Sequence, residues 1–318
     1  MKTVYITTMM ISALIMLILP LTAQTAVTEL PVSAEPQTNV TPVISDSVDV
    51  KIKLSSTGEI TEVSLSDYLF GVVAAEMPAL YEVEALKAQA VAAYTYFLIQ
   101  KEGNSDNDYD ITDDYTVDQA YVSVETARQK WGDGADTFEE KIRSAVESVL
   151  GERVLYGEEP ARTVYHAVSF GVTENAKDVW GGDYPYLTSV DSSFDKLEKN
   201  FLSEKTVTAE ELKSALSALA EVKDLNKNCI TDITRTSAGG VKNLKVSGKE
   251  ITGAELRKAL ELKSANFEVD FKDGKYTFSV KGYGHAVGMS QNGANYLALQ
   301  GKTYKEILLH YYTGCTVE

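Results

Sequence analysis

Residues 67–97 read DYLFGVVAAEMPALYEVEALKAQAVAAYTYF, an apolar helical pattern on each side of a proline. Before the proline, four positions spaced i, i+3, i+4 and i+7 would share one helix face: Leu69, Val72, Val73 and Glu76. One carboxylate therefore lies on the face that this helix would bury. The pattern predicts a buried acid and not a solvated surface charge.

Both helices have predictable ends. The first is expected over 67–76 with Ser66 as its N-cap, and Pro78 disfavours helical geometry at the residue before it. The second is expected over 83–99, where small alanines allow close packing. Its apolar seam consists of Val83, Leu86, Ala90, Ala93 and Phe97.

The rest of the chain predicts mixed secondary structure. A helix is expected over 137–151, and paired strands over 152–157 and 159–169. Residues 103–116, rich in Asp and Asn, predict a solvated loop. Two antiparallel hairpins follow later, the second turning on Asp273-Gly274. Three Thr-x-x-Glu capping boxes open further helices: Thr208 with Glu211, Thr252 with Glu255, and Thr303 with Glu306. The fold class is therefore α+β, without the strand–helix alternation of doubly wound folds.

The N-terminus predicts export. Residues 1–23 form a nearly uncharged apolar stretch behind Lys2, typical of a signal peptide or a membrane anchor. Cleavage and retention both stay open, because residues 21–23 (LTA) are only a mediocre cleavage site. Residues 24–48 predict a flexible tether, and residues 49–318 a domain of two lobes. That domain is expected outside the cytoplasm, at the membrane face or in the cell wall.

Composition narrows the classes of ligand. The 318 residues carry a net charge of −16, which argues against nucleic acid or an anionic membrane surface as the main ligand. A neutral or cationic ligand is easier to accommodate. Only Cys229 and Cys315 are present, and the sequence leaves their pairing open.

Glu76 is the first candidate for chemistry. At a helix C-terminus, the negative end of the macrodipole disfavours a carboxylate, and an apolar surrounding disfavours its ionisation further. Both effects raise the pKa, as a general acid at neutral pH requires. The structural alternative is a Glu that reaches out to Lys87 or caps a neighbouring loop.

A glycine-rich segment, GYGHAVGMSQNGA at 282–294, is the second candidate. Its glycines indicate close approach of the backbone to a ligand or to other backbone, and Ser290 is expected to cap a helix that begins at Gln291. His285 favours a site there, although a structural turn stays open. His166 ends an apolar strand, where either a site residue or a structural hydrogen-bond donor is usual, and His310 is expected to be structural.

Two common catalytic classes lack their signatures. The His and Cys residues are scattered at spacings unlike those of zinc sites, and no His-Glu-x-x-His occurs. No Gly-x-Ser-x-Gly nucleophile elbow is found either. We therefore expect neither a metal centre nor a serine triad.

Four ordered blocks resemble the stage II sporulation protein D (SpoIID) family, whose domain also occurs in amidase enhancers of the bacterial wall. The resemblance covers about residues 50 to 315. The blocks begin DYLFGVVAAEMP at 67, YHAVSFGVTENAKDVWGG at 165, ITRTSAGGVKNLKVSG at 233 and GYGHAVGMSQNGANY at 282.

The resemblance implies a lytic transglycosylase. Such an enzyme cuts the MurNAc-β-1,4-GlcNAc bond of glycan strands stripped of their stem peptides and leaves 1,6-anhydroMurNAc ends, here in the engulfment step of sporulation. Glu76, in the family's AAEMP, would be the single catalytic residue. The alternative is a non-catalytic, glycan-binding enhancer of a cell-wall amidase. Implied partners are denuded glycan, such an amidase and a membrane scaffold protein.

Nine further positions match the family and are implied to bind glycan or support Glu76: Lys87, Gln89, Tyr96, His166, Ser169, Glu174, Arg235, His285 and Gln291. Two departures stand beside them. Tyr94 occupies a position where the family commonly has Arg, and residues 166–171 read HAVSFG where HSTSGG is usual. The added cysteines through which some members hold zinc near this turn are absent, so no metal or other cofactor is expected.

Overall fold

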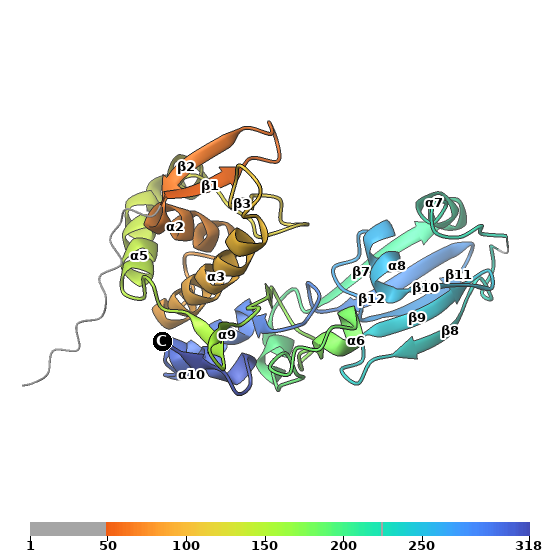
Figure 1. Ribbon diagram of the computed structural model, residues 1–318. Helices are drawn as coiled ribbons and strands as arrows, with labels where there is room; N and C mark the ends of the chain where they lie inside the picture. The colour runs from red at the N-terminus through yellow and green to blue at the C-terminus, as the bar shows by residue number, and fades with distance from the viewer. Residues whose placement is uncertain (1–48, 224) are drawn as a thin grey trace, which may run out of the picture. The chain divides into compact units, whose positions relative to one another are not determined.

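The computed structural model describes residues 49–318 with the exception of residue 224 (Figure 1). It consists of mixed helices and largely antiparallel sheets, which confirms the α+β class. The segments 1–23 and 24–48, expected to form an anchor or signal peptide and a tether, lie outside the described residues. No helix in the described part of the chain combines the length and apolarity needed to cross a bilayer. The division of residues 49–318 into two lobes stays a prediction.

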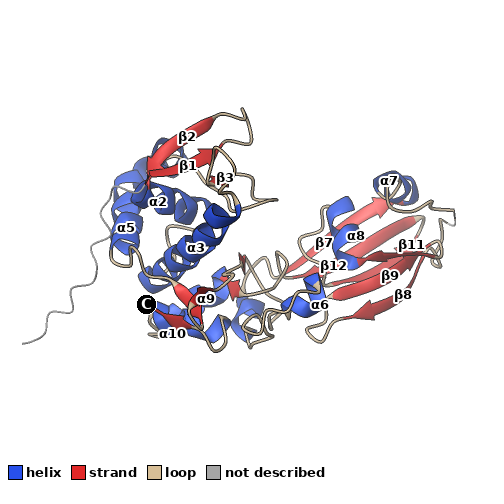
Figure 2. Ribbon diagram, viewed as in Figure 1, coloured by secondary structure: helices blue, strands red, loops and turns tan. Residues whose placement is uncertain are grey.

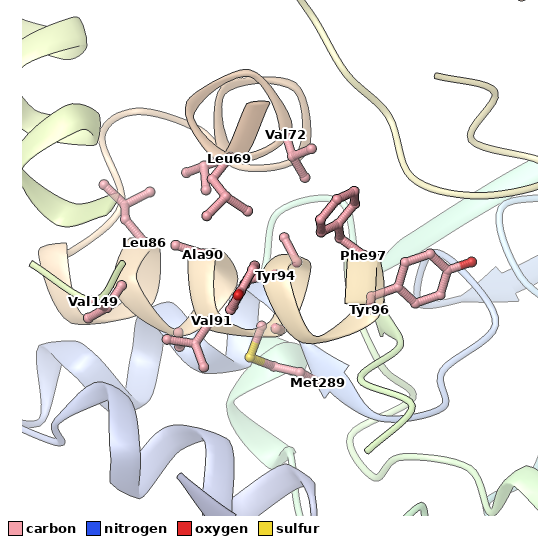
Figure 3. Close-up of a cluster of buried hydrophobic side chains, with 14 of the residues drawn as sticks. Leu69, Val72, Leu86, Ala90, Val91, Tyr94, Tyr96, Phe97, Val149 and Met289 are labelled. Atoms are coloured by element: carbon pink, nitrogen blue, oxygen red, sulfur yellow. The ribbon is translucent and has the colours of Figure 1, made fainter. Parts of the chain in front are cut away.

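The first hydrophobic cluster is mainly helical (Figure 2). Its three central helices contact one another: α2 (Leu65–Glu76), α3 (Val83–Gly103) and α5 (Ala135–Glu147). Leu69 and Val72 of α2 lie on one side of α3 and Met289 on the other (Figure 3). The predicted seam of α3 is buried except at Val83, which is 40% exposed.

Further elements complete this part of the molecule. The helices are α4 (Val124–Trp131), α6 (Ala176–Trp180), α9 (Gln291–Leu299) and α10 (Tyr304–Tyr311), with 3₁₀ turns η1 (Gly132–Gly134) and η2 (Ser193–Leu197). The strands are β1 (Asp49–Lys53), β2 (Ile60–Ser64), β3 (Ile111–Thr112), β4 (Val154–Tyr156), β5 (Glu159–Pro160), β6 (Tyr165–His166), β13 (Met289–Ser290) and β14 (Thr316–Val317).

Two local expectations were wrong, and a third is right only in part. The N-cap of α2 is Ser64 and not Ser66, because the extended Ser64 at the end of β2 accepts a hydrogen bond from the Asp67 amide. The strand predicted over 159–169 pairs with β4 only at β5, whereas β6 pairs in parallel with the distant β13. The loop predicted over 103–116 is observed for most of that range, but Ile111 and Thr112 form β3, which pairs with β1.

The second hydrophobic cluster lies among two three-stranded antiparallel sheets. One has the order β11-β12-β7 and the other β10-β9-β8, and α8 packs on β9 (Figure 1). The strands are β7 (Leu202–Thr208), β8 (Ile230–Arg235), β9 (Val241–Val246), β10 (Lys249–Thr252), β11 (Phe267–Lys272) and β12 (Lys275–Lys281), with helices α7 (Ala209–Ala215) and α8 (Gly253–Ala259).

The predicted capping boxes and the predicted hairpin turn are confirmed. All three Thr-x-x-Glu capping boxes form, at the starts of α7, α8 and α10. The β11–β12 hairpin turns at Asp273 and Gly274, both with positive φ (50° and 74°). Cys229 and Cys315 are free and buried in different clusters, so they do not pair here.

Gly71 allows the segment after β3 to lie directly on α2. The Gly71 carbonyl accepts a hydrogen bond from the Val122 amide at 3.3 Å. A Cβ at Gly71 would stand 2.4 Å from the Val122 oxygen and 2.3 Å from the Tyr121 ring. Only glycine permits this contact, which holds residues 120–122 beside the C-terminal half of α2.

We predict that Gly71→Ala lowers the free energy of unfolding by about 2–3 kcal/mol, because the added methyl group meets backbone that cannot move away easily. Gly103→Ala is the matched control, since a Cβ at that helical position has nothing within 4 Å. It should be neutral or stabilise by up to about 1 kcal/mol. Urea unfolding followed by circular dichroism measures both, and equal stabilities of the two variants would contradict the proposed contact.

Candidate active site

Glu76 is the last residue of α2, and two distant segments hold its carboxylate. Its Oε2 accepts a hydrogen bond from the Gln291 side chain at 3.1 Å, and its Oε1 accepts one from the Ala120 amide at 3.2 Å. Gln291 is the first residue of α9, whose N-cap Ser290 accepts from the Gly293 amide, as predicted. The acid is thus fixed from both sides by neutral donors.

Burial raises the pKa of Glu76 above its ordinary value, and the hydrogen bonds from Gln291 and Ala120 offset part of that rise. This is the direction that the sequence predicted. The structural alternative is half right. Glu76 does not reach Lys87, because the Lys87 ammonium pairs with Glu84 at 2.8 Å, but it does accept from the Ala120 amide of a neighbouring loop. A partly desolvated carboxyl without a cationic partner is suited to remain protonated until it is used.

Gln89 is fully buried next to this contact. Its Oε1 accepts from Gln291 at 3.4 Å, and its own amide nitrogen has no partner among the described residues. The Gln291 amide therefore lies between Glu76 and Gln89, which restricts its orientation. Sequence reasoning had named both glutamines, and the structure brings them together at the acid.

A cavity of about 470 Å³ lies beside this cluster, and its walls are largely aromatic and polar. The lining residues are Tyr96, Tyr115, Thr116, Val117, Asp118, Gln119, Arg162, Val164, Tyr165, Trp180, Gly182, Tyr184 and His285. Glu76 is not itself on the wall. Two neighbouring residues connect Glu76 to the cavity wall. The Ala120 amide donates to Glu76, and the preceding residue, Gln119, lines the wall and accepts through Oε1 from the Tyr165 hydroxyl at 2.7 Å.

Two aromatic side chains of the cavity are accessible to a ligand. Tyr115 is 77% exposed and Trp180 45% exposed, so both rings are open to a ligand. Burial, together with the neighbouring Asp118, raises the pKa of Tyr96 to about 12, so its phenol stays a hydrogen-bond donor. Aromatic faces beside a few polar groups are typical of binding sites for small polar ligands.

His285, on the cavity wall, lies next to the buried His166, with ring centroids 5.7 Å apart. His166 Nδ1 donates to the Val287 carbonyl at 3.1 Å, whereas His285 Nδ1 accepts from the Val287 amide at 3.1 Å. Burial lowers the pKa of His166 to about 4 and that of His285 to about 3. Both rings are therefore neutral near pH 7, and the buried His166 Nε2 is an acceptor without a partner among the described residues.

Glu174 lies apart from Glu76. Its Oε1 accepts from the Thr236 hydroxyl at 2.6 Å and from the Gly240 amide at 3.2 Å, and burial raises its pKa. A Cβ at Gly240 would stand 2.4 Å from this oxygen, so the contact needs glycine. In the described residues, no three His, Cys, Asp or Glu side chains gather in a group that could hold a metal ion.

Three other predicted positions make structural contacts. Lys87 pairs with Glu84 and lies over the Tyr304 ring. The buried Ser169 accepts from the Gly171 amide in its own turn. Arg235, on β8, donates to two backbone carbonyls and to Glu268.

Sequence reasoning missed Gln119, Tyr165 and Trp180, which line the cavity, and Asp195, which accepts from the hydroxyl of Ser290, the residue before Gln291. Asp195 is fully buried in η2, within a polar stretch that the sequence presents as an ordinary surface turn. The one usable signal was the aromatic density around Trp180. The other three depend on contacts between residues far apart in the chain.

Comparison with known proteins places this site in a family. The family model described as Stage II sporulation protein matches residues 53–156. Stage II sporulation protein D of Bacillus amyloliquefaciens is 34% identical over 281 residues, which cover 87% of this chain and 80% of that protein. The Bacillus subtilis protein of the same name is 35% identical over 274 residues, covering 85% and 79%. The chain belongs to the stage II sporulation protein D family.

The family named from the sequence is therefore confirmed. Glu76, Lys87, Gln89 and Tyr96 lie within the matched region 53–156. An amidase enhancer of Bacillus subtilis is also similar, at 31% identity, and the aligned region covers 78% of this chain but 40% of that protein. Tyr94, which departs from the usual family Arg, is buried in the first cluster, with its ring stacked on Phe97 at 6.5 Å between centroids.

The raised pKa of Glu76 predicts a pH-dependent stability difference. The folded chain holds this proton more tightly than the unfolded chain, so Glu76 weakens folding as the pH rises from about 4 towards 7. The free energy of unfolding of Glu76→Gln, minus that of wild type, should become more positive over this range. Urea unfolding at several pH values measures it.

Glu125→Gln, at an exposed position, controls for the loss of one negative charge. The difference in free energy of unfolding, Glu76→Gln minus wild type, could instead stay constant or fall with rising pH. That result would show that the folded protein does not disfavour the ionised form of Glu76.

Proposed function

We propose that this protein is a lytic transglycosylase that cleaves MurNAc-β-1,4-GlcNAc bonds in glycan strands stripped of stem peptides. The observation that carries the proposal is Glu76: a partly buried carboxyl with a raised pKa, held by the Gln291 side chain and the Ala120 amide beside an aromatic cavity. Membership of the sporulation family supports the biological setting.

One carboxyl group can serve both halves of this reaction. Protonated Glu76 donates its proton to the glycosidic oxygen, and the bond from this oxygen to C1 of MurNAc breaks. The oxygen of the same sugar's 6-hydroxyl then bonds to C1, and its proton returns to the Glu76 carboxylate. The products are a strand ending in 1,6-anhydroMurNAc and a new GlcNAc end, with no water consumed.

The neighbours of Glu76 suit these two steps. The hydrogen bonds from Gln291 and Ala120 stabilise the carboxylate that exists between them, while burial favours the acid at the start. Asp118 is a second carboxylate on the cavity wall, but its oxygens accept from the Gln100 side chain and the Thr112 amide. Because both of its oxygens already accept hydrogen bonds, Asp118 fits a structural role. A hydrolase would need a second catalytic carboxylate.

The same proposal places the protein at the extracytoplasmic face of the membrane or in the cell wall during engulfment, where denuded glycan is its substrate. A cell-wall amidase that strips the strands and a membrane scaffold protein are the proposed partners. Both follow from the resemblance to the family.

The second candidate function is non-catalytic enhancement of an amidase. Two observations favour it: the name of the amidase enhancer relative, and Tyr94, a buried aromatic residue where the family commonly has Arg. In that case the cavity would grip the strand and Glu76 would be a binding group.

We predict that wild type forms anhydroMurNAc ends on denuded glycan, detected by mass spectrometry, and that Glu76→Gln forms them at least about 100-fold more slowly, because the amide cannot supply the proton. New reducing ends without anhydro ends would instead indicate a hydrolase. Uncut strands with a folded wild type, and equal stimulation of an amidase by both proteins, would favour the enhancer.

Gln291→Leu should lower the cleavage rate by about tenfold, because Glu76 loses a positioning donor. It should also move the alkaline limb of the pH–rate profile to higher pH, since this hydrogen bond lowers the pKa of Glu76. Gln300→Leu, at the exposed end of α9, is the control. An unchanged alkaline limb in Gln291→Leu would mean that another group sets it.

A further inference from the structure

A second cavity of about 460 Å³ lies next to the first and shares two of its residues, Trp180 and His285. Its walls come from the segment 170–181, from β9 and from α8. The proposed reaction uses only the first cavity. A polymeric substrate long enough to pass Trp180 would enter the second.

Arg257 of α8 lines this second cavity without a counterion. Its Nε donates to the Leu262 carbonyl at 3.3 Å, and no carboxylate of the described residues lies within ion-pair distance. The side chain is partly buried, and burial lowers the pKa of its guanidinium. A partly desolvated cation that donates to a backbone carbonyl and has no counterion is suited to bind an anionic ligand.

The charged side chains that line this cavity are three cations, Lys177, Lys242 and Arg257, and two carboxylates, Glu174 and Asp178, which leaves one positive charge in excess. Asp178 pairs with Lys242 at 3.4 Å. Glu174 accepts from Thr236 and Gly240 through Oε1, whereas its buried Oε2 has no partner among the described residues. Lys177 is exposed at the rim, and it makes no ion pair within the described residues. An anion at Arg257 would therefore meet a second cation at the rim.

Trp180 supplies the apolar contact. The indole ends α6 and lies against His285, with ring centroids 5.1 Å apart, while nearly half of the side chain remains exposed. An aromatic face of this kind packs against the C–H face of a pyranose ring. Because Trp180 belongs to both cavities, a single chain of sugars could cross it.

We propose that the second cavity is a glycan subsite in which Arg257 binds the free carboxylate of an acidic sugar while the strand packs on Trp180. This inference rests on the proposed function. A muramic residue carries a lactyl carboxylate, which is free only after the peptide amide bond has been cut. A charge contact at Arg257 would then distinguish stripped strands from strands that still carry peptides, in which that carboxylate is an uncharged amide.

The test measures the dissociation constants of two ligands of equal length by calorimetry. One is a denuded glycan oligosaccharide with free lactyl carboxylates, and the other is the same oligosaccharide with each carboxylate converted to its methyl amide. The full chain carries Glu76→Gln so that no cleavage occurs. With Arg257 intact, the acidic ligand should bind about tenfold tighter, as expected for a hydrogen bond between charged groups.

Arg257→Gln should abolish that preference while leaving the affinity for the amide ligand unchanged, which also reports a correct fold. Lys258→Gln is the matched control, because it removes the same charge from α8. Lys258 is exposed and does not line the cavity. It should keep the tenfold preference. Should Arg257→Gln lose both ligands, Arg257→Lys decides instead, since the retained charge should preserve most of the preference.

The inference would be overturned if the acidic and the amide ligand had equal dissociation constants with Arg257 intact. It would also be overturned if Arg257→Gln kept the preference for the acidic ligand. Loss of the preference in Arg257→Lys to the same extent as in Arg257→Gln would overturn it as well. Cleavage is assayed separately with Glu76 restored. Binding that depends on Arg257 without cleavage would count against the transglycosylase alone, and cleavage without that dependence would count against the subsite alone.

Discussion

Asp195 is the buried charge on which the site is built. Its carboxylate has no exposed surface and accepts four hydrogen bonds from three segments of the chain. The donors are the Ser169 amide, the Ser192 hydroxyl, the Ser290 hydroxyl and the Asn292 side-chain amide, at 2.8 to 3.1 Å. Charge-assisted hydrogen bonds of this kind offset the large cost of removing a carboxylate from water. They fix the turn after His166 and the start of α9 with respect to each other.

That constraint reaches the catalytic candidate in one step. Ser290 bonds to Asp195 and caps α9, and the next residue, Gln291, donates to Glu76. The parallel pairing of Ser290 with His166 carries the same restraint to the histidine pair. The Glu76 contact and the histidine pair are therefore both positioned by the Asp195 carboxylate and the N-terminus of α9.

The site also illustrates a conflict between stability and chemistry. Burying Glu76 without a cation disfavours its ionised form. This lowers the free energy of unfolding at pH values above the pKa that Glu76 has in the unfolded chain. The same burial keeps a proton available for transfer. Arg257 shows the corresponding feature for binding: a partly desolvated cation is left without a carboxylate of its own. In both places an ion pair that would stabilise the free protein is missing among the described residues. At Glu76 its absence favours the protonated acid, and at Arg257 it leaves the cation free for an anionic ligand.

Much of the local structure and the central acid could be read from the sequence. The two helices on each side of Pro78, the three capping boxes, the turn at Asp273-Gly274 and the cap at Ser290 depend on residues only a few positions apart. The direction of the Glu76 pKa also followed, because an acid on an apolar face is buried wherever that helix packs. The four blocks further indicated the family.

Other features required the folded chain. The choice of Ser64 over Ser66 as N-cap depends on where β2 ends, and the pairing of β6 with β13 joins residues more than 120 positions apart. Asp195, Gln119 and Arg257 sit in segments whose local pattern resembles any solvated turn or helix surface. Their burial, their partners and the missing counterion of Arg257 come from distant segments meeting in space. Local sequence carries no signal for such contacts, because the residues that satisfy or desolvate a charge are chosen by packing and not by spacing along the chain.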